Sequence, residues 1–107
     1  MLEGKILKVR FQKHYAEQRI WVFIGKALKF TENWLMLEGK GILISKGSIN
    51  PVDIDSEKRI ILIPQNNIAH IRILPDDFDL DKIEIHTKGV RIFVRVKGGP
   101  DTSIGEI

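Results

Sequence analysis

The residue types that bind metals or move protons are scattered along this sequence. The three histidines, His14, His70 and His86, lie in different segments, and none has a second ligand at helical or strand spacing. A zinc site needs about three or four converging ligands, and the chain has no cysteine to supply them. The sequence therefore predicts no metal site and no cofactor. It favours His70 and His86 as polar-face residues of strands.

Four aspartates form an acidic segment after Pro75, at positions Asp76, Asp77, Asp79 and Asp81. Carboxylates at alternate positions can bind calcium, but this segment lacks the glycine turn and the terminal glutamate of the helix-loop-helix calcium site. A solvated loop is the favoured interpretation.

Motifs for covalent chemistry are missing. The chain has no Gly-x-Ser-x-Gly, and Gly39-Lys40-Gly41 lacks the rest of a phosphate-binding loop. Paired carboxylates for glycoside chemistry are compatible with the sequence, but no spacing points to them. We therefore expect no enzyme activity and no small-molecule substrate.

Aromatic residues beside basic ones are the remaining chemical signal. The sequence has two such places, which are Trp34 near Asn33, Lys29 and Lys40, and Phe93 between Arg91 and Arg95. Single-stranded nucleic acid is held by bases that stack on rings while cations contact phosphates. Each ring has a structural alternative, because large aromatics also fill cores and interfaces. Trp34 then packs in a core or interface, and Phe93 packs between sheets or subunits.

Strand patterns dominate the elements that would position these residues. In residues 5–11, Leu7, Val9 and Phe11 alternate with Lys8 and Arg10, the period of a half-buried strand. Further strands are predicted at residues 19–30, 34–44, 60–63 and 68–74. The run from Ile20 to Ile24 is apolar on both faces, which indicates burial on both sides or cover from a neighbouring subunit.

Glycines and polar clusters predict the connections. Gly25, Gly39 and Gly41 interrupt long strands and favour a strongly curved sheet. Turns are predicted at residues 31–33 and 64–67, the second as a tight turn or one helical turn. Residues 12–18 and 45–58 are predicted as a connection, with one helical turn as an option, and as a long loop.

The C-terminal third predicts a β-hairpin followed by a tail. Residues 82–87 and 90–96 flank Lys88-Gly89, which has the composition of a two-residue turn. In that register Ile83 lies opposite Val94, and Ile85 lies opposite Ile92. The glycine-rich residues 97–107 are predicted to be frayed.

Length and charge bound the class of protein. The 107 residues fit one domain, and the net charge is +3. Residues 1–50 have nine Lys/Arg and four Asp/Glu, whereas residues 51–107 have eight and ten, so the first half suits an anionic partner better. Ordinary solvated strand faces remain the alternative. Charges interrupt the N-terminal apolar residues, and no stretch is long and apolar enough for a membrane span. We expect a soluble, cytoplasmic protein with no membrane partner.

Two segments resemble the signature segments of the Sm-like family. In the first, Gly25, Ala27, Phe30 and Thr31 stand where that family has a glycine, a small apolar residue, an aromatic and an aspartate, and Trp34, Leu35 and Leu37 follow. In the second, Ile63, Asn66, Ile68 and Ile71 fit the apolar and polar positions of the closing strand.

The resemblance implies an all-β fold, a small, strongly bent Sm-like or SH3-like open barrel. Its core would span about residues 5–75, with an extra C-terminal hairpin at 82–96 and a tail at 97–107, all within one domain. It also implies edge-to-edge assembly into a homo-oligomeric ring. The family's uridine pocket is altered here. Its aspartate, asparagine, arginine and glycine are replaced by Thr31, Leu35, Pro64 and Gln65, and only Asn66 is of the same kind as in the family.

We therefore expect an Sm-like homo-oligomeric module that binds single-stranded RNA. The alternative is a structural or protein-interaction module without nucleic-acid binding. The candidate base-binding residues are Thr31, Asn33, Trp34, Asn66 and Asn67, and the candidate phosphate contacts are Lys26, Lys29 and Lys40.

Overall fold

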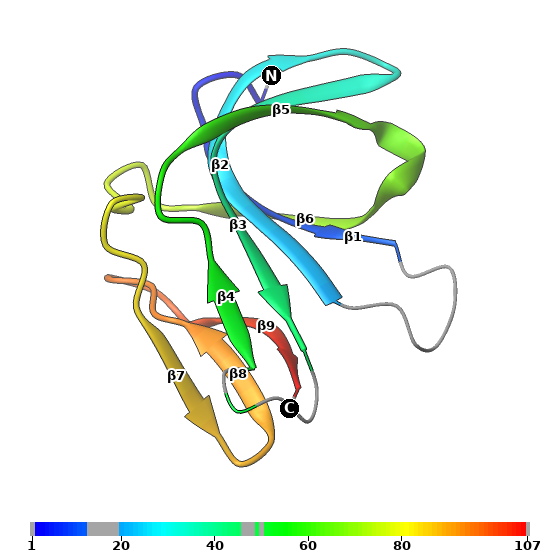
Figure 1. Ribbon diagram of the computed structural model, residues 1–107. Helices are drawn as coiled ribbons and strands as arrows, with labels where there is room; N and C mark the ends of the chain where they lie inside the picture. The colour runs from blue at the N-terminus through cyan, green and yellow to red at the C-terminus, as the bar shows by residue number, and fades with distance from the viewer. Residues whose placement is uncertain (1, 13–19, 46–48, 50, 107) are drawn as a thin grey trace.

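The computed structural model describes residues 2–12, 20–45, 49 and 51–106 (Figure 1). Within these residues the regular structure is nine strands and one 3-10 turn, so the expected all-β fold is confirmed. The strands form two antiparallel sheets. The predicted connection at 12–18 lies outside the described residues, apart from Gln12.

The larger sheet contains six strands in the order β4-β3-β2-β1-β6, and β5 also pairs with β3. Its strands are β1 (Ile6–Phe11), β2 (Ile20–Phe30), β3 (Trp34–Ile44), β4 (Val52–Ile54), β5 (Arg59–Pro64) and β6 (Ile68–Leu74). The 3-10 turn η1 (Gln65–Asn67) links β5 to β6. Figure 1 shows the sheet curving, so that the chain passes from β5 at one end of the pairing order to β6 at the other.

The sheet bends along the pairing of β2 with β3. The first half of β3 pairs with β5 and the second half with β4, and Gly39 is the last residue paired with β5. Gly39 also lies opposite Gly25 of β2. A Cβ atom on Gly39 would lie 2.0 Å from the carbonyl oxygen of Ile24. The two backbones therefore approach as closely as they do only because no side chain separates them.

The smaller sheet consists of β7 (Ile85–Lys88), β8 (Arg91–Val94) and β9 (Thr102–Glu106). The predicted hairpin is present, but the predicted register was wrong by two residues. Ile85, rather than Ile83, lies opposite Val94. The turn is formed by Gly89 and Val90, and Gly89 has φ +63°. A two-residue hairpin loop with glycine in its first position has this form.

Two predicted irregular segments contain strands. Residues 102–106 of the expected frayed tail form β9, and Ile104 at its centre is completely buried. Residues 52–54 of the expected long loop form β4 on the end of β3. Both strands are short, and each is stabilised by pairing with an earlier strand rather than by a local sequence pattern.

Apolar side chains bury both faces of the larger sheet. The inner cluster, inside the bend, contains Leu7, Val9, Phe11, Phe23, Ala27, Leu35, Leu37 and Ile63. The second cluster joins the other face to the smaller sheet and contains Ile6, Val22, Ile24, Ile42, Ile44, Leu74, Ile92, Val94, Val96 and Ile104. The smaller sheet of the same chain therefore covers Val22 and Ile24, and Phe23 is buried inside the bend. A neighbouring subunit is not needed for that burial.

Lys8 corrects the expectation of a solvated polar face on β1. Its residue is 3% exposed, because the smaller sheet lies over this part of β1. Lys8 Nζ donates a hydrogen bond to the carbonyl oxygen of Ser103 in β9 at 2.9 Å. Burial, together with the nearby charges of Arg10 and Arg72, lowers the pKa of Lys8 from 10.5 to about 8.

The Gly39 contact predicts a strong effect of one methyl group. We expect Gly39→Ala to lower the free energy of unfolding by about 2–3 kcal/mol, because the new Cβ atom collides with backbone that cannot move freely. Gly99→Ala is the matched control, since its Cβ atom would meet only Val96 Cγ1 at 3.8 Å. Urea unfolding measures both, and equal stabilities for the two variants would contradict the close approach.

The burial of Lys8 predicts a pH-dependent gain from its removal. At pH 7 the Lys8→Met variant should be more stable by about 1–2 kcal/mol, because a desolvated charge is lost. Between about pH 8 and 10.5 the folded Lys8 loses its proton before the unfolded one does, so wild-type stability rises with pH. The advantage of the variant should therefore shrink in this range. Thermal unfolding at pH 7 and pH 9.5 measures it, and a constant difference would contradict the lowered pKa.

Candidate nucleic-acid interface

The turn between β2 and β3 is closed by one threonine. The backbone N–H of Thr31 donates to the carbonyl oxygen of Trp34 at 2.9 Å. The Thr31 hydroxyl accepts from the Trp34 N–H at 3.0 Å and lies 3.3 Å from the Trp34 carbonyl oxygen. A short hydroxyl side chain forms such local bonds readily. The predicted turn is confirmed, and its tip is Glu32-Asn33.

Gln65, the first residue of η1, joins this turn to the second signature segment. Its backbone N–H donates to the carbonyl oxygen of Asn33 at 2.8 Å, and its side-chain Nε2 donates to the carbonyl oxygen of Thr31 at 3.0 Å. Trp34 lies opposite Pro64 in the ladder between β3 and β5. The two segments that are far apart in the sequence therefore meet at one end of the sheet.

The other side of η1 is tied to the end of β1. The backbone N–H of Gln12 donates to the carbonyl oxygen of Asn67 at 2.9 Å, and Gln12 Nε2 donates to that of Ile68 at 3.2 Å. These bonds fix η1 between two neighbours, although its own sequence has no capping side chain. The backbone of the candidate site is thus held from both sides.

The structure brings together the five residues predicted to bind a base. Thr31, Asn33 and Trp34 are exposed on the turn, and Asn66 is exposed on η1 beside the half-buried Asn67. Trp34 is 44% exposed, so it is not a core residue of this chain. Rings and amides on a shared surface can stack a base and bind its edge.

The three predicted phosphate contacts are less well placed. Lys29 lies opposite Met36, near the turn, whereas Lys26 lies opposite Glu38 farther along the strands. Lys40 is half-buried opposite Ile24, about 20 Å along β3 from Trp34 at the usual rise per residue. Only Lys29 is close enough to the turn to share a short ligand with Trp34.

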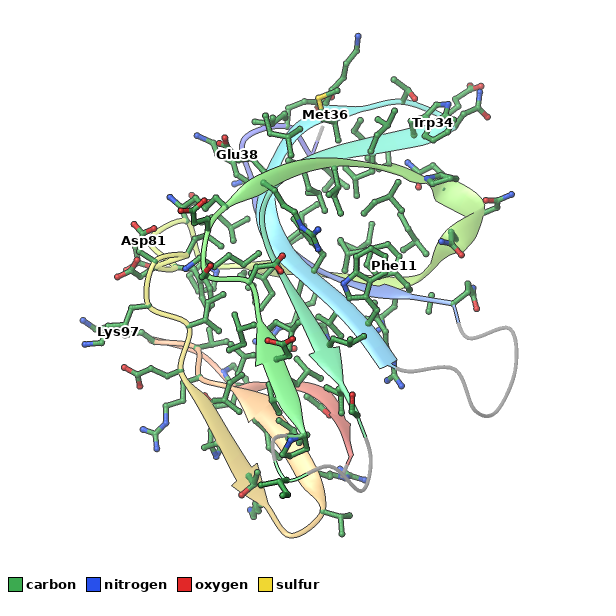
Figure 2. All side chains as sticks on the ribbon, in the orientation of Figure 1. Phe11, Trp34, Met36, Glu38, Asp81 and Lys97 are labelled. Carbon is green, nitrogen blue, oxygen red and sulfur yellow. The ribbon has the colours of Figure 1, made fainter. Side chains whose placement is uncertain are left out.

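An exposed apolar row continues from Trp34 along the outer side of the bend. Figure 2 shows Trp34, Met36 and Glu38 along this side of β3. Their partners on β5 are Pro64, Leu62 and Ile60, and Leu62 and Ile60 are 52% and 58% exposed. We call the row of Trp34, Met36, Ile60, Leu62 and Pro64 the apolar row. The sequence placed all of these residues except Pro64 on strands, but it did not indicate that their outer face lacks cover.

The second aromatic candidate lies on the outer face of the smaller sheet. Phe93 stacks on His86 with ring centroids 5.4 Å apart, so it packs neither between the sheets nor in the core. His86 Nε2 lies 2.6 Å from Asp101 Oδ2, and Asp101 also accepts the backbone N–H of Val96 at 2.9 Å. These bonds lower the pKa of Asp101, the Val96 contact first and His86 second. The interactions hold the segment after β8 against β7.

A groove of about 590 Å³ lies between the acidic segment and residues 95–101, and Asp101 is one of its lining residues. Its charged residues are Asp77, Asp79, Glu84 and Asp101 together with Lys82, Arg95 and Lys97. The mixture of signs does not select one class of ligand. In the described part of the chain no group of three or more His, Asp or Glu side chains is placed to hold a metal ion.

Sequence reasoning missed two features of the surface. The bridging role of Gln65 has no signal in the sequence, because its partners belong to another segment. The other is a group of basic side chains on β1 and β6, which depends on the pairing between two strands far apart in the chain.

Comparison with known proteins gives no match: no family model, no curated protein and no solved structure matches this chain. Within the described residues, none of the helical structure is long and apolar enough to cross a membrane.

Proposed function

We propose that the chain is an Sm-like module that binds single-stranded RNA at the β2–β3 turn and η1. The observation that carries the proposal is the pair of bonds from Gln65 to Thr31 and Asn33, which unites the two signature-like segments. The exposed ring of Trp34 supplies a stacking surface beside them. The strand order and the bend support a small open barrel of the Sm-like or SH3-like kind.

The altered pocket residues define what kind of RNA binding is proposed. Thr31 uses its hydroxyl within the turn, and Gln65 uses its side-chain N–H₂ to hold Thr31. Few side-chain groups are therefore left to read a base edge, and stacking on Trp34 carries most of the interaction. Stacking tolerates any base, so we propose weak sequence preference and salt-sensitive binding.

A second candidate function is favoured by the apolar row. Ile60 and Leu62 lie on β5, which among the described residues pairs only with β3. An apolar strand at the end of a sheet is suited to pair with another chain. We propose that this strand joins copies of the chain in a homo-oligomeric protein-interaction module that does not require RNA.

Trp34 provides the test of RNA binding. We expect Trp34→Ala to weaken binding of a labelled single-stranded RNA about tenfold, because loss of one stacked base has that size of effect. Phe93→Ala is the matched control, since Phe93 is also an aromatic beside basic residues but lies on the other sheet. Fluorescence anisotropy at low and moderate salt measures both. Wild-type binding no tighter than that of a protein matched in net charge would refute RNA binding, and loss on Phe93→Ala alone would refute this site.

Leu62 provides the test of assembly. We expect the wild type to form an assembly larger than a monomer at micromolar concentration, stable at high salt, because apolar contacts are not screened. Leu62→Lys should give a monomer, whereas Val90→Lys at the exposed hairpin turn should not. Light scattering measures the mass. A monomeric wild type would exclude both the ring and this second function.

A further inference from the structure

Four basic side chains share one face of β1 and β6. Lys8 lies directly opposite Arg72, and Arg10 lies directly opposite His70. Residues two apart on a strand point to the same face, and opposite residues on neighbouring strands have Cβ atoms about 5 Å apart. These four residues, the basic cluster, therefore form a compact block in which Lys8, Arg10 and Arg72 are like charges.

The cluster has no counter-charge among the residues that the structure describes. None of its members forms an ion pair with a described carboxylate. Its cations contact neutral carbonyl oxygens instead, with Lys8 Nζ 2.9 Å from Ser103 O and Arg72 Nη2 2.6 Å from Pro100 O. Arg10 is half-buried, and its side chain forms no hydrogen bond or ion pair with the described residues.

The arrangement costs stability in the unliganded protein. Lys8 is almost completely buried, and like charges a few ångströms away repel it. Burial and the charges of Lys8 and Arg10 also lower the pKa of His70. A bound anion would reverse each of these effects, because its negative charge attracts the three cations and favours the protonated form of His70.

We propose that the basic cluster binds a phosphate group. Arg10 and Arg72 are half-buried on this face, and the buried Lys8 adds its charge from beneath the smaller sheet. Three cations grouped in this way suit a multiply charged anion better than a single carboxylate. The planar arginine forks match tetrahedral phosphate oxygens, and the carbonyl bonds of Lys8 and Arg72 hold two of the cations in position. The phosphate belongs either to a small phosphorylated compound or to a nucleic-acid backbone.

This site is separate from the proposed RNA interface and does not rest on it. The pair of Arg10 and His70 lies within three residues of η1, but the cluster occupies the face of β1 and β6 that turns toward the smaller sheet, whereas the proposed RNA interface is formed by the β2–β3 turn and η1. Two of the cluster's side chains donate hydrogen bonds to carbonyl oxygens of Ser103 in β9 and of Pro100 in the preceding loop. The smaller sheet, which the Sm-like resemblance does not include, thus helps to form it.

Arg10→Gln is the test, with tripolyphosphate as the probe in isothermal titration calorimetry. We expect the variant to bind tripolyphosphate about tenfold more weakly than the wild type, because it loses charge-assisted hydrogen bonds. Its melting temperature without ligand should be equal or higher, since repulsion is relieved. Arg91→Gln, an exposed arginine on β8, is the matched control and should bind within about twofold of the wild type.

The outcomes separate the proposal from nonspecific attraction. No saturable binding by the wild type, or equal weakening by Arg10→Gln and Arg91→Gln, would overturn it. Arg72→Gln is a second variant and should also weaken binding. Competition by a single-stranded oligonucleotide without terminal phosphates would identify a nucleic-acid backbone as the source, and lack of competition would identify a small phosphorylated compound. Trp34→Ala should leave tripolyphosphate binding unchanged, so the RNA proposal fails or survives independently.

Discussion

The structure depends on burying both faces of the central strands. β2 contributes Phe23 to the inner cluster and Val22 and Ile24 to the second cluster, and all three are fully buried. A sheet with two apolar faces needs cover on each. The bend through Gly25 and Gly39 folds the sheet over one face, and the C-terminal sheet covers the other. The second sheet is therefore part of the core rather than an appendage.

This constraint explains which elements could be predicted from the sequence. β3 and β6 were predicted at residues 34–44 and 68–74 and are found there, because a local pattern of apolar residues and turns bounds each. β9 has no such pattern, since its stability comes from pairing with β8 and from burial of Ile104. Lys8 looked like a solvated residue because alternation gives the two faces of a strand but not what covers them.

The candidate site was predictable in parts but not as a unit. The turn at 31–33 was predicted from its polar residues, and the turn at 64–67 from a proline followed by polar residues. Their contact through Gln65 depends on the path of the chain from β5 to β6, which no local signal gives. The same holds for the basic cluster, because only the register between β1 and β6 places Arg10 opposite His70.

The two proposed sites differ in which interaction would favour binding of a ligand. At the β2–β3 turn the side chains of Thr31 and Gln65 are already hydrogen-bonded, so a ligand gains mainly from the exposed ring of Trp34. In the basic cluster the cations form no ion pair with a described carboxylate, so a ligand gains from relief of repulsion built into the folded state. The repulsion is held in place because the second sheet, which the apolar faces require, also covers Lys8 and supplies the carbonyl groups at Pro100 and Ser103. The burial that stabilises the fold thus also holds the cations of β1 and β6 close together, and a bound anion would relieve their repulsion.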